Sequence, residues 1–234
     1  MRAVILAAGM GRRLGREMPK ALIRLEDGKT ILQHLLDGLG RVVRREDITV
    51  VVGFQKQRIM QAFPDLTYVE NPDYRTTRTA KSLQLALAGL DGHTVLLAEG
   101  DVVCDPRVIT RVAEGTGERM ATHRIAVGEE EMKFRTRPDG MIERLSKALS
   151  DGEGEALAIN RFGPEMCRRL LKHLQRCQPM DFFESAIELC IGEGFSIYPI
   201  DVSDLYGFDV DFPEDLEAAN RALSEQSSRG NDYG

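Results

Sequence analysis

The chain has 234 residues, of which 42% are hydrophobic and 29% charged, and its formal net charge is −6 at pH 7. This length is enough for one large α/β domain with a sizeable core. The acidic balance argues against nucleic acid as a partner, and no apolar run approaches the roughly 20 residues of a membrane span.

The chain opens on an apolar run over residues 3–8, which has the length and composition of a buried strand. A loop follows that contains Gly9, Gly11, Arg12 and Arg13 and closes with Pro19-Lys20. Glycines let backbone N–H groups approach an oligophosphate because no Cβ stands in the way. The spacing matches neither G-x-G-x-x-G nor G-x-x-x-x-G-K-[ST], so it predicts a phosphate site of another kind.

The next segments alternate between helical and strand patterns. Helices are predicted over 30–42, 55–63 and 79–90, and strands over 47–53, 66–70 and 93–98. This order predicts a Rossmann-like α/β fold, a mainly parallel sheet with helices on both faces. Ligands of such sheets bind at the carboxyl ends of the strands, where the first loop lies.

The second half has a different pattern, and Asp139-Gly140 marks a hairpin turn within it. Strands are predicted over 121–128, 132–136, 141–145, 156–162 and 196–200, and helices over 163–176, 181–192 and 213–223. Without a linker, we expect one domain over 1–223, with a nucleotide-binding half (1–128) and an acceptor-binding half (129–223) that contains the small hairpin. The polar residues 224–234 are expected to form a disordered tail.

Two acidic segments are placed to complete a phosphate site. Asp101 follows a buried strand, and Asp209 and Asp211 precede the last helix. Mg²⁺ prefers hard oxygen ligands, with few protein carboxylates and oxygens from the substrate's own phosphates. Asp101 and Asp211 are therefore the expected ligands, and Asp209 is the competitor for the second position. Taken singly, Asp101 and Asp211 also suit the start of a helix or a turn.

Several motifs together carry a family resemblance. The strings L-A-A-G-M-G-R-R-L with P-K, E-N-P-D-Y, E-G-D-V-V and D-V-D-F-P-E-D-L occur in the order expected of sugar-phosphate nucleotidyltransferases. Glu99-Gly100-Asp101, Met132-Lys133 and Leu145-Ser146-Lys147 make the chain most similar to small cytidylyltransferases that act on phosphocholine, 2-aminoethylphosphonate and related phospho- or phosphono-alcohols. The resemblance implies a Rossmann-like fold, Mg²⁺ as cofactor and CTP as nucleotide.

The resemblance also assigns roles to single residues. Arg13 and Lys20 would hold the triphosphate and act in catalysis, and Asp101 and Asp211 would hold the metal. The expected nucleotide contacts are Leu6, Ala7, Ala8, Gly9, Gly11, Arg12, Arg13, Lys20, Ser82 and Glu99. Lys133 or Lys147 would meet the acceptor's phosphoryl group.

The segment after Glu70-Asn71-Pro72-Asp73-Tyr74 departs from the family. Relatives usually continue with a Thr-Asn-Asn type of run, whereas this chain has Thr76-Thr77-Arg78-Thr79. Arg78 is therefore either a phosphate or acceptor contact or a solvated charge at a helix start.

The expected reaction is CMP transfer from CTP to a small phosphonate or phosphate monoester. Choline is disfavoured because the chain has no Trp and only 6% aromatic residues, and cages for quaternary ammonium groups are aromatic. Glu184 is expected to be available to an amine or hydroxyl, beside Phe182 and Phe183, which are either a pocket edge or core residues.

Three other functions remain open. A sugar-1-phosphate nucleotidyltransferase that uses UTP or dTTP shares the first loop, and a non-catalytic nucleotide-binding module would be expected to lack a metal carboxylate. A nicotinamide-dependent oxidoreductase explains the first turn but not Lys20, Asp101 or Asp211. The scattered cysteines and the short N-terminal apolar run favour a cytoplasmic protein without a membrane partner.

Overall fold

The opening apolar run forms β1 (Arg2–Ala7), which is buried from Ala3 onward. The computed structural model describes residues 1–15, 17–126 and 128–231, and in this part of the chain the main sheet has nine strands. The others are β2 (Ile48–Val52), β3 (Thr67–Glu70), β4 (Val95–Glu99), β6 (Glu118–His123), β7 (Lys133–Thr136), β8 (Ile142–Ser146), β9 (Gly154–Phe162) and β10 (Ile197–Asp201).

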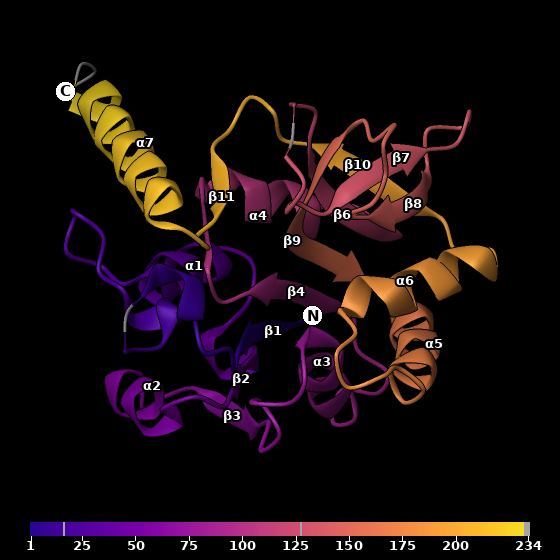
Figure 1. The fold of residues 1–234 in the computed structure, drawn as a ribbon, viewed down its shortest axis with the longest axis horizontal. Helices are drawn as coiled ribbons and strands as arrows, with labels where there is room; N and C mark the ends of the chain where they lie inside the picture. Colours follow the sequence, from indigo (N-terminus) through magenta and orange to yellow (C-terminus); the bar gives the residue numbers. More distant parts are fainter. Residues whose placement is uncertain (16, 127, 232–234) are drawn as a thin grey trace.

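The pairing confirms a mainly parallel sheet. The order is β10-β6-β9-β4-β1-β2-β3, with β1 parallel to β2 and β4, β2 parallel to β3, and β10 parallel to β6. β9 runs antiparallel between β4 and β6, so the sheet is mixed at that point. The carboxyl ends of β1 and β4 therefore lie side by side (Figure 1).

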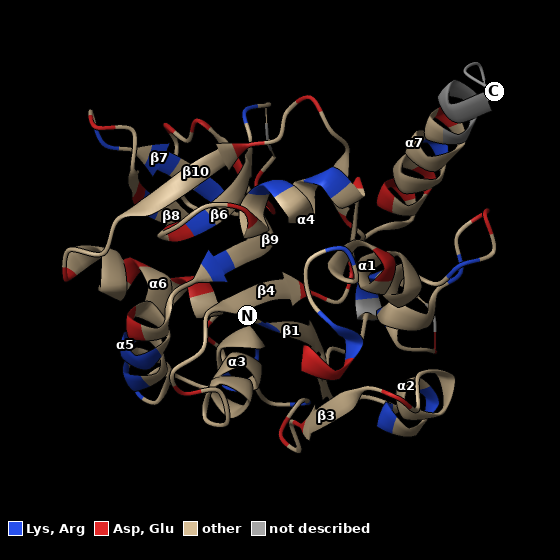
Figure 2. Cartoon of the chain, turned by 180° about the vertical axis from the view of Figure 1, so that it is seen from behind, with Lys and Arg blue, Asp and Glu red and all other residues tan. Residues whose placement is uncertain are grey.

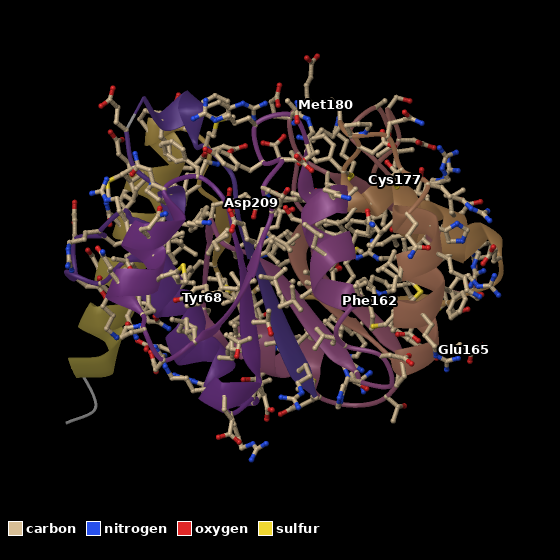
Figure 3. The ribbon with its side chains drawn as sticks, turned by 90° about the horizontal axis from the view of Figure 1, so that it is seen from below. Tyr68, Phe162, Glu165, Cys177, Met180 and Asp209 are labelled. Atoms are coloured by element: carbon tan, nitrogen blue, oxygen red, sulfur yellow. The ribbon has the colours of Figure 1, made fainter. Side chains whose placement is uncertain are left out.

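Helices cover both faces of the sheet, as predicted. The helices are α1 (Ile31–Leu39), α2 (Lys56–Ala62), α3 (Thr79–Leu87), α4 (Pro106–Ala113), α5 (Pro164–Leu174), α6 (Phe183–Gly192) and α7 (Pro213–Asn231). One core cluster contains side chains of α1, α2 and α4, and the other contains those of α3, α5 and α6. In Figure 3, Tyr68 and Phe162 lie on opposite sides of the sheet.

The predicted hairpin is present. β7 and β8 pair antiparallel, and Gly140 has a φ of +82°, the left-handed conformation that a glycine adopts without strain. β7 also pairs with β9, so the hairpin extends the main sheet next to the cleft described below.

Some short elements lay outside the prediction. β5 (Val102–Cys104) pairs antiparallel with β11 (Gly207–Asp209), and three-residue strands are too short to show a period. The 3-10 turns Arg12–Leu14, Lys20–Leu22 and Arg45–Asp47 are equally short. α4 was also not predicted, although the sequence contains a signal for its start. Asp105 caps its N-terminus, and Pro106 occupies the first turn.

The end of α7 corrects the expected disordered tail. The helix continues to Asn231, beyond the predicted end at Leu223, and residues 232–234 lie outside the described part. No glycine or proline interrupts the sequence from Glu214 to Arg229, so nothing in it stops the helix. α7 projects from the body of the molecule (Figure 1), and Leu216 packs in a third apolar cluster with Val210.

Charged residues of both signs are interspersed on α5 and α7 (Figure 2).

Within the described residues, no helix is long and apolar enough to cross a membrane.

Candidate active site

A cleft of about 760 Å³ lies over the carboxyl ends of β1 and β4, where the sequence placed the phosphate site. Both halves of the chain line it. The predicted site residues in its lining are Leu6, Ala7, Ala8, Gly9, Gly11, Arg13, Lys20, Arg78, Ser82, Glu99, Asp101, Lys147, Glu184, Asp209 and Asp211.

Among the described residues of the prediction, Lys133 is not part of this lining. The Nζ atom of Lys133 donates to the backbone carbonyl of Lys147 at 3.0 Å. Lys147 is therefore the better placed of the two lysines suggested for the acceptor. The side chain of Arg12 lies outside the described part of the structure.

Glycines bring the first loop close to its lysine. Gly11 has a φ of +59°, and a Cβ there would lie 2.6 Å from Cγ of Lys20. At Gly100, a Cβ would lie 2.8 Å from that of Ala7, so glycine allows the chain leading to Asp101 to cross the end of β1 closely. At both positions, the absence of a side chain lets neighbouring parts of the site approach each other closely.

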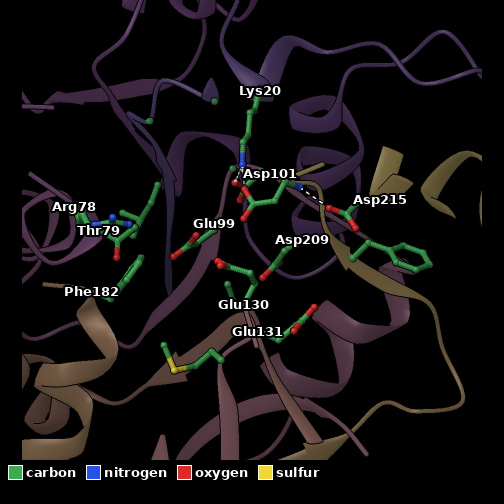
Figure 4. Close-up of a pocket in the computed structure, with 18 of the residues that line it drawn as sticks. Lys20, Arg78, Thr79, Glu99, Asp101, Glu130, Glu131, Phe182, Asp209 and Asp215 are labelled. Atoms are coloured by element: carbon green, nitrogen blue, oxygen red, sulfur yellow. Dashed lines mark hydrogen bonds and ion pairs between the residues drawn. The ribbon is translucent and has the colours of Figure 1, made fainter. Parts of the chain in front are cut away.

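Five charged side chains converge from both halves of the chain. Nζ of Lys20 lies 2.9 Å from Oδ2 of Asp101 and also donates to Oδ1 of Asp211. Nη1 of Arg13 lies 2.9 Å from Oδ2 of Asp211, and its Nη2 lies 3.1 Å from Oε2 of Glu130. Residues 198 positions apart thus form one ionic network. Figure 4 shows its members Lys20 and Asp101 side by side in the cleft.

The sequence left open whether Asp101 and Asp211 serve only to begin a helix or a turn. In the structure, other aspartates accept the backbone hydrogen bonds at these helix starts. Asp105 caps α4, and Oδ2 of Asp215 accepts from the backbone N–H groups of Asp211 and Phe212 before α7. Asp101 and Asp211 are thus not needed as caps.

The network keeps its members charged. Burial by itself lowers the pKa of Lys20, but Asp101 and Asp211 outweigh it and raise that pKa well above its usual value. Burial would raise the pKa of Asp211, yet Lys20 and Arg13 hold it below its usual value. Lys20 is therefore a permanent cation and Asp211 a permanent anion at neutral pH.

The two aspartates fit a magnesium ion that is also bound by phosphate. Both carboxylates reach the same ammonium group, so their oxygens are close enough to share one cation. Within the described residues, no group of three or more His, Cys, Asp or Glu is placed to hold a metal alone. Two hard carboxylates that need further oxygen ligands are what Mg²⁺ uses at nucleotide sites.

A polar network in the cleft lining joins the predicted Ser82 to Asn71 and Thr77, to which the prediction gave no role. Asn71, which is 1% exposed, donates through Nδ2 to Oγ1 of Thr77 and Oγ of Ser82, both at 3.1 Å. All three residues line the cleft. The available signal was the E-N-P motif at the end of β3.

Phe182 separates two cations on the other side of the cleft. The Arg78 guanidinium lies 4.6 Å and the Lys147 ammonium 5.3 Å from the centre of its ring. Phe182 lines the cleft, whereas Phe183 is fully buried in the core. Of the two roles that the sequence allowed, the pocket edge therefore applies to Phe182 and the core to Phe183. The Lys147 ammonium also donates to the backbone carbonyl of Glu130 and lies 3.9 Å from Oε2 of that residue, so an anionic group would compete with Glu130 for it.

Carboxylates without a cationic partner line the middle of the cleft. Within the described residues, no ion pair or side-chain hydrogen bond joins the carboxylates of Glu99, Glu131, Glu155, Glu184 or Asp209 to another side chain. Burial, with neighbouring acids, raises the pKa of Glu99 and of Asp209 well above the usual range. Burial likewise raises the pKa of Glu184 to about 7. Figure 4 shows Glu99, Asp209 and Glu131 around one space, and Figure 3 shows Asp209 in the interior.

Glu155 gives a prediction for stability. Burial, with Glu131 and Asp215, raises its pKa from 4.5 to about 7, while Asp209 also faces it and His123 and Lys133 lie opposite it in the sheet. Between pH 4.5 and about pH 7, Glu155 has lost its proton in the unfolded chain but keeps it in the folded protein. The free energy of unfolding therefore falls as pH rises through this range and stays reduced above it. We expect Glu155→Gln to stabilise the empty protein at about pH 8 by on the order of 1–3 kcal/mol.

Urea denaturation at several pH values measures this effect. The advantage of Glu155→Gln should shrink toward about pH 4.5, where the folded and unfolded forms are both protonated. A variant that is less stable than the parent at every pH would contradict the prediction.

Comparison with known proteins identifies this architecture. Residues 3–178 match the MobA-like NTP transferase domain. The CMP-5'-(3-aminopropyl)phosphonate synthase of Streptomyces rubellomurinus is 31% identical, over 96% of this chain but 39% of its own length. The UTP–glucose-1-phosphate uridylyltransferase AglF of Haloferax volcanii is 26% identical, over 98% of this chain and 99% of its own.

A solved structure shows the same fold. The CTP:phosphocholine cytidylyltransferase of Streptococcus pneumoniae superposes with a TM-score of 0.77 at 16% identity, over 95% of this chain and 98% of the other. The predicted fold class and the resemblance to nucleotidyltransferases, the small cytidylyltransferases among them, are thus confirmed.

Proposed function

The chain belongs to the MobA-like NTP transferase family, and on that premise we propose that it is a Mg²⁺-dependent cytidylyltransferase. It joins CMP from CTP to a small phosphonate or phosphate monoester and releases pyrophosphate. The observation that carries the proposal is the convergence of Lys20, Asp101, Asp211 and Arg13 at the carboxyl ends of β1 and β4.

The reaction needs positioning and charge rather than a general base. An oxygen of the acceptor's phosphate or phosphonate attacks the α-phosphorus of CTP, in line with the departing pyrophosphate. A phosphate monoester has its second pKa near ~6, so at neutral pH it is already an anion. The protein's task is to bring two anions together and to neutralise the developing charge.

The charged network divides this task. Lys20, which stays protonated, lies where the two anions meet, and Arg13 steadies the leaving pyrophosphate. A magnesium ion held by Asp101 and Asp211 would supply further positive charge to the phosphate oxygens. When the nucleotide binds, Arg13 and Lys20 exchange carboxylate partners for phosphate oxygens, so the cations that receive the triphosphate are already in place.

A relative supports the preference for cytidine, and the composition bears on the choice of acceptor. The relative from Streptomyces rubellomurinus is named for a CMP phosphonate product, and this chain spans 39% of its length. The absence of Trp disfavours quaternary ammonium acceptors. A sugar-1-phosphate uridylyl- or thymidylyltransferase is the second candidate, because a relative that matches almost end to end is named for glucose 1-phosphate.

Pyrophosphate release with Mg²⁺ tests the proposal across four nucleoside triphosphates. The acceptors are phosphocholine, phosphoethanolamine, 2-aminoethylphosphonate, 2-hydroxyethylphosphonate and glucose 1-phosphate. We expect release with CTP and a small non-sugar acceptor. Release confined to glucose 1-phosphate with UTP or dTTP would support the second candidate, and a protein that binds nucleotide but releases nothing would favour a non-catalytic module.

A further inference from the structure

One part of the cleft contains acidic side chains that make no ion pair with a cation among the described residues. We call it the anionic lobe, and it consists of Glu131, Glu155 and Asp209, with His123 next to them. Oε2 of Glu131 and Oδ1 of Asp209 are buried and have no hydrogen-bond partner in the described part of the chain. Lys133 lies opposite Glu155 in the sheet, but its ammonium donates to the carbonyl of Lys147 instead.

His123 adds another hydrogen-bond acceptor to the lobe. Its side chain is 5% exposed, and its Nε2 is buried without a partner. Burial lowers its pKa, so the ring is neutral at pH 7, and the hydrogen bonds to the backbone of Leu205 and Val202 that oppose this shift are made by the other ring nitrogen. A neutral imidazole that donates through Nδ1 offers a lone pair at Nε2.

The lobe therefore gathers three acidic side chains and one imidazole lone pair. A primary ammonium has three donors and no acceptor, and its positive charge favours the ionised form of acids whose pKa burial has raised. Within the described residues, no group of three or more His, Cys, Asp or Glu is placed to hold a metal ion by itself. Because the magnesium ion is assigned to Asp101 and Asp211, the lobe is left for an organic cation.

We infer that the anionic lobe binds the ammonium group of the acceptor substrate, which is thus an aminoalkyl phosphonate or phosphate. This inference rests on the proposed function and specifies its substrate class. The phosphonate end is left to the cations Lys20, Arg78 and Lys147, which line the same cleft. Charge complementarity fixes the direction of the acceptor, because its anionic end cannot enter the lobe.

The test compares acceptors that differ only in the ammonium group. Propylphosphonate carries a methyl where 2-aminoethylphosphonate has its ammonium, and butylphosphonate matches 3-aminopropylphosphonate in the same way. We expect kcat/KM with CTP to favour the amine at least about 30-fold, the usual range for a buried charge pair. Glu155→Gln should remove most of this preference by raising KM for the amine, while KM for CTP stays unchanged.

The matched control is Glu129→Gln. Glu129 is exposed on the segment that carries Glu131 but does not line the cleft. This variant should keep the wild-type preference. Equal kcat/KM for amine and methyl acceptors in the wild type, or an equal loss for both acceptors in Glu155→Gln, would overturn the inference.

A failure of the amine site can be distinguished from a failure of the proposed function. If no acceptor is turned over while CTP binds, calorimetric titration of 2-aminoethylphosphonate into the wild type and Glu155→Gln still tests the lobe. Binding that Glu155→Gln weakens at least about tenfold would uphold the amine site without the reaction. Absent or equal binding would overturn it.

Discussion

Lys20→Ala should lower kcat/KM about 100- to 1000-fold while the protein stays folded, a loss typical of removing a preorganised charge from a reacting phosphoryl or acyl group. The Lys20 side chain is 15% exposed, and its ammonium lies between Asp101 and Asp211, where alanine would leave no positive charge in contact with both carboxylates. Steady-state pyrophosphate release, with CTP and the preferred acceptor each varied, measures the change. Lys29→Ala is the matched control, because Lys29 pairs with Asp37 at the surface.

Thermal unfolding of both variants separates chemistry from stability. Lys20→Ala leaves two carboxylates near each other, so a modest loss of stability is expected, with Arg13 still in contact with Asp211. Near-normal turnover in a folded Lys20→Ala protein would remove Lys20 from the catalytic residues.

Asp211→Asn should reduce turnover about 100-fold and raise the Mg²⁺ concentration needed for half-maximal activity. The substitution keeps the size of the side chain but removes the charge that Lys20 and Arg13 contact and that a magnesium ion would need. Magnesium titration of the initial rate measures both effects. Asp204→Asn is the control, since Asp204 pairs with Arg111 outside the cleft. An unchanged magnesium requirement in Asp211→Asn would shift the metal role to Asp209.

The positions of the main elements followed from apolar periodicity because most strands and helices are buried on one or more faces. β1 is an unbroken apolar run in the centre of the sheet, and α1 repeats its leucines at helical spacing. The antiparallel direction of β9 did not follow, since a buried strand reads alike in either direction. The end of α7 was placed too early because polarity was taken for disorder, although polar residues can continue a helix.

The charged part of the site was predictable because its residues are tied to strand ends and glycines. Asp101 follows β4 directly, and the glycine-rich loop follows β1, so parallel neighbours bring them together. The anionic lobe was not predictable in the same way. Glu155 is one acid at the start of an apolar strand, and only the antiparallel pairing of β9 and the β5–β11 pairing place it near Asp209.

The measurement that tests the central claim most directly is phosphorus NMR of CTP, 2-aminoethylphosphonate and Mg²⁺ with the purified protein. The account predicts that the CTP resonances give way to pyrophosphate and to a coupled pair from a phosphonate–CMP anhydride, and that Lys20→Ala suppresses both. CTP that persists beside this acceptor, while UTP or dTTP is consumed with glucose 1-phosphate, would contradict the account.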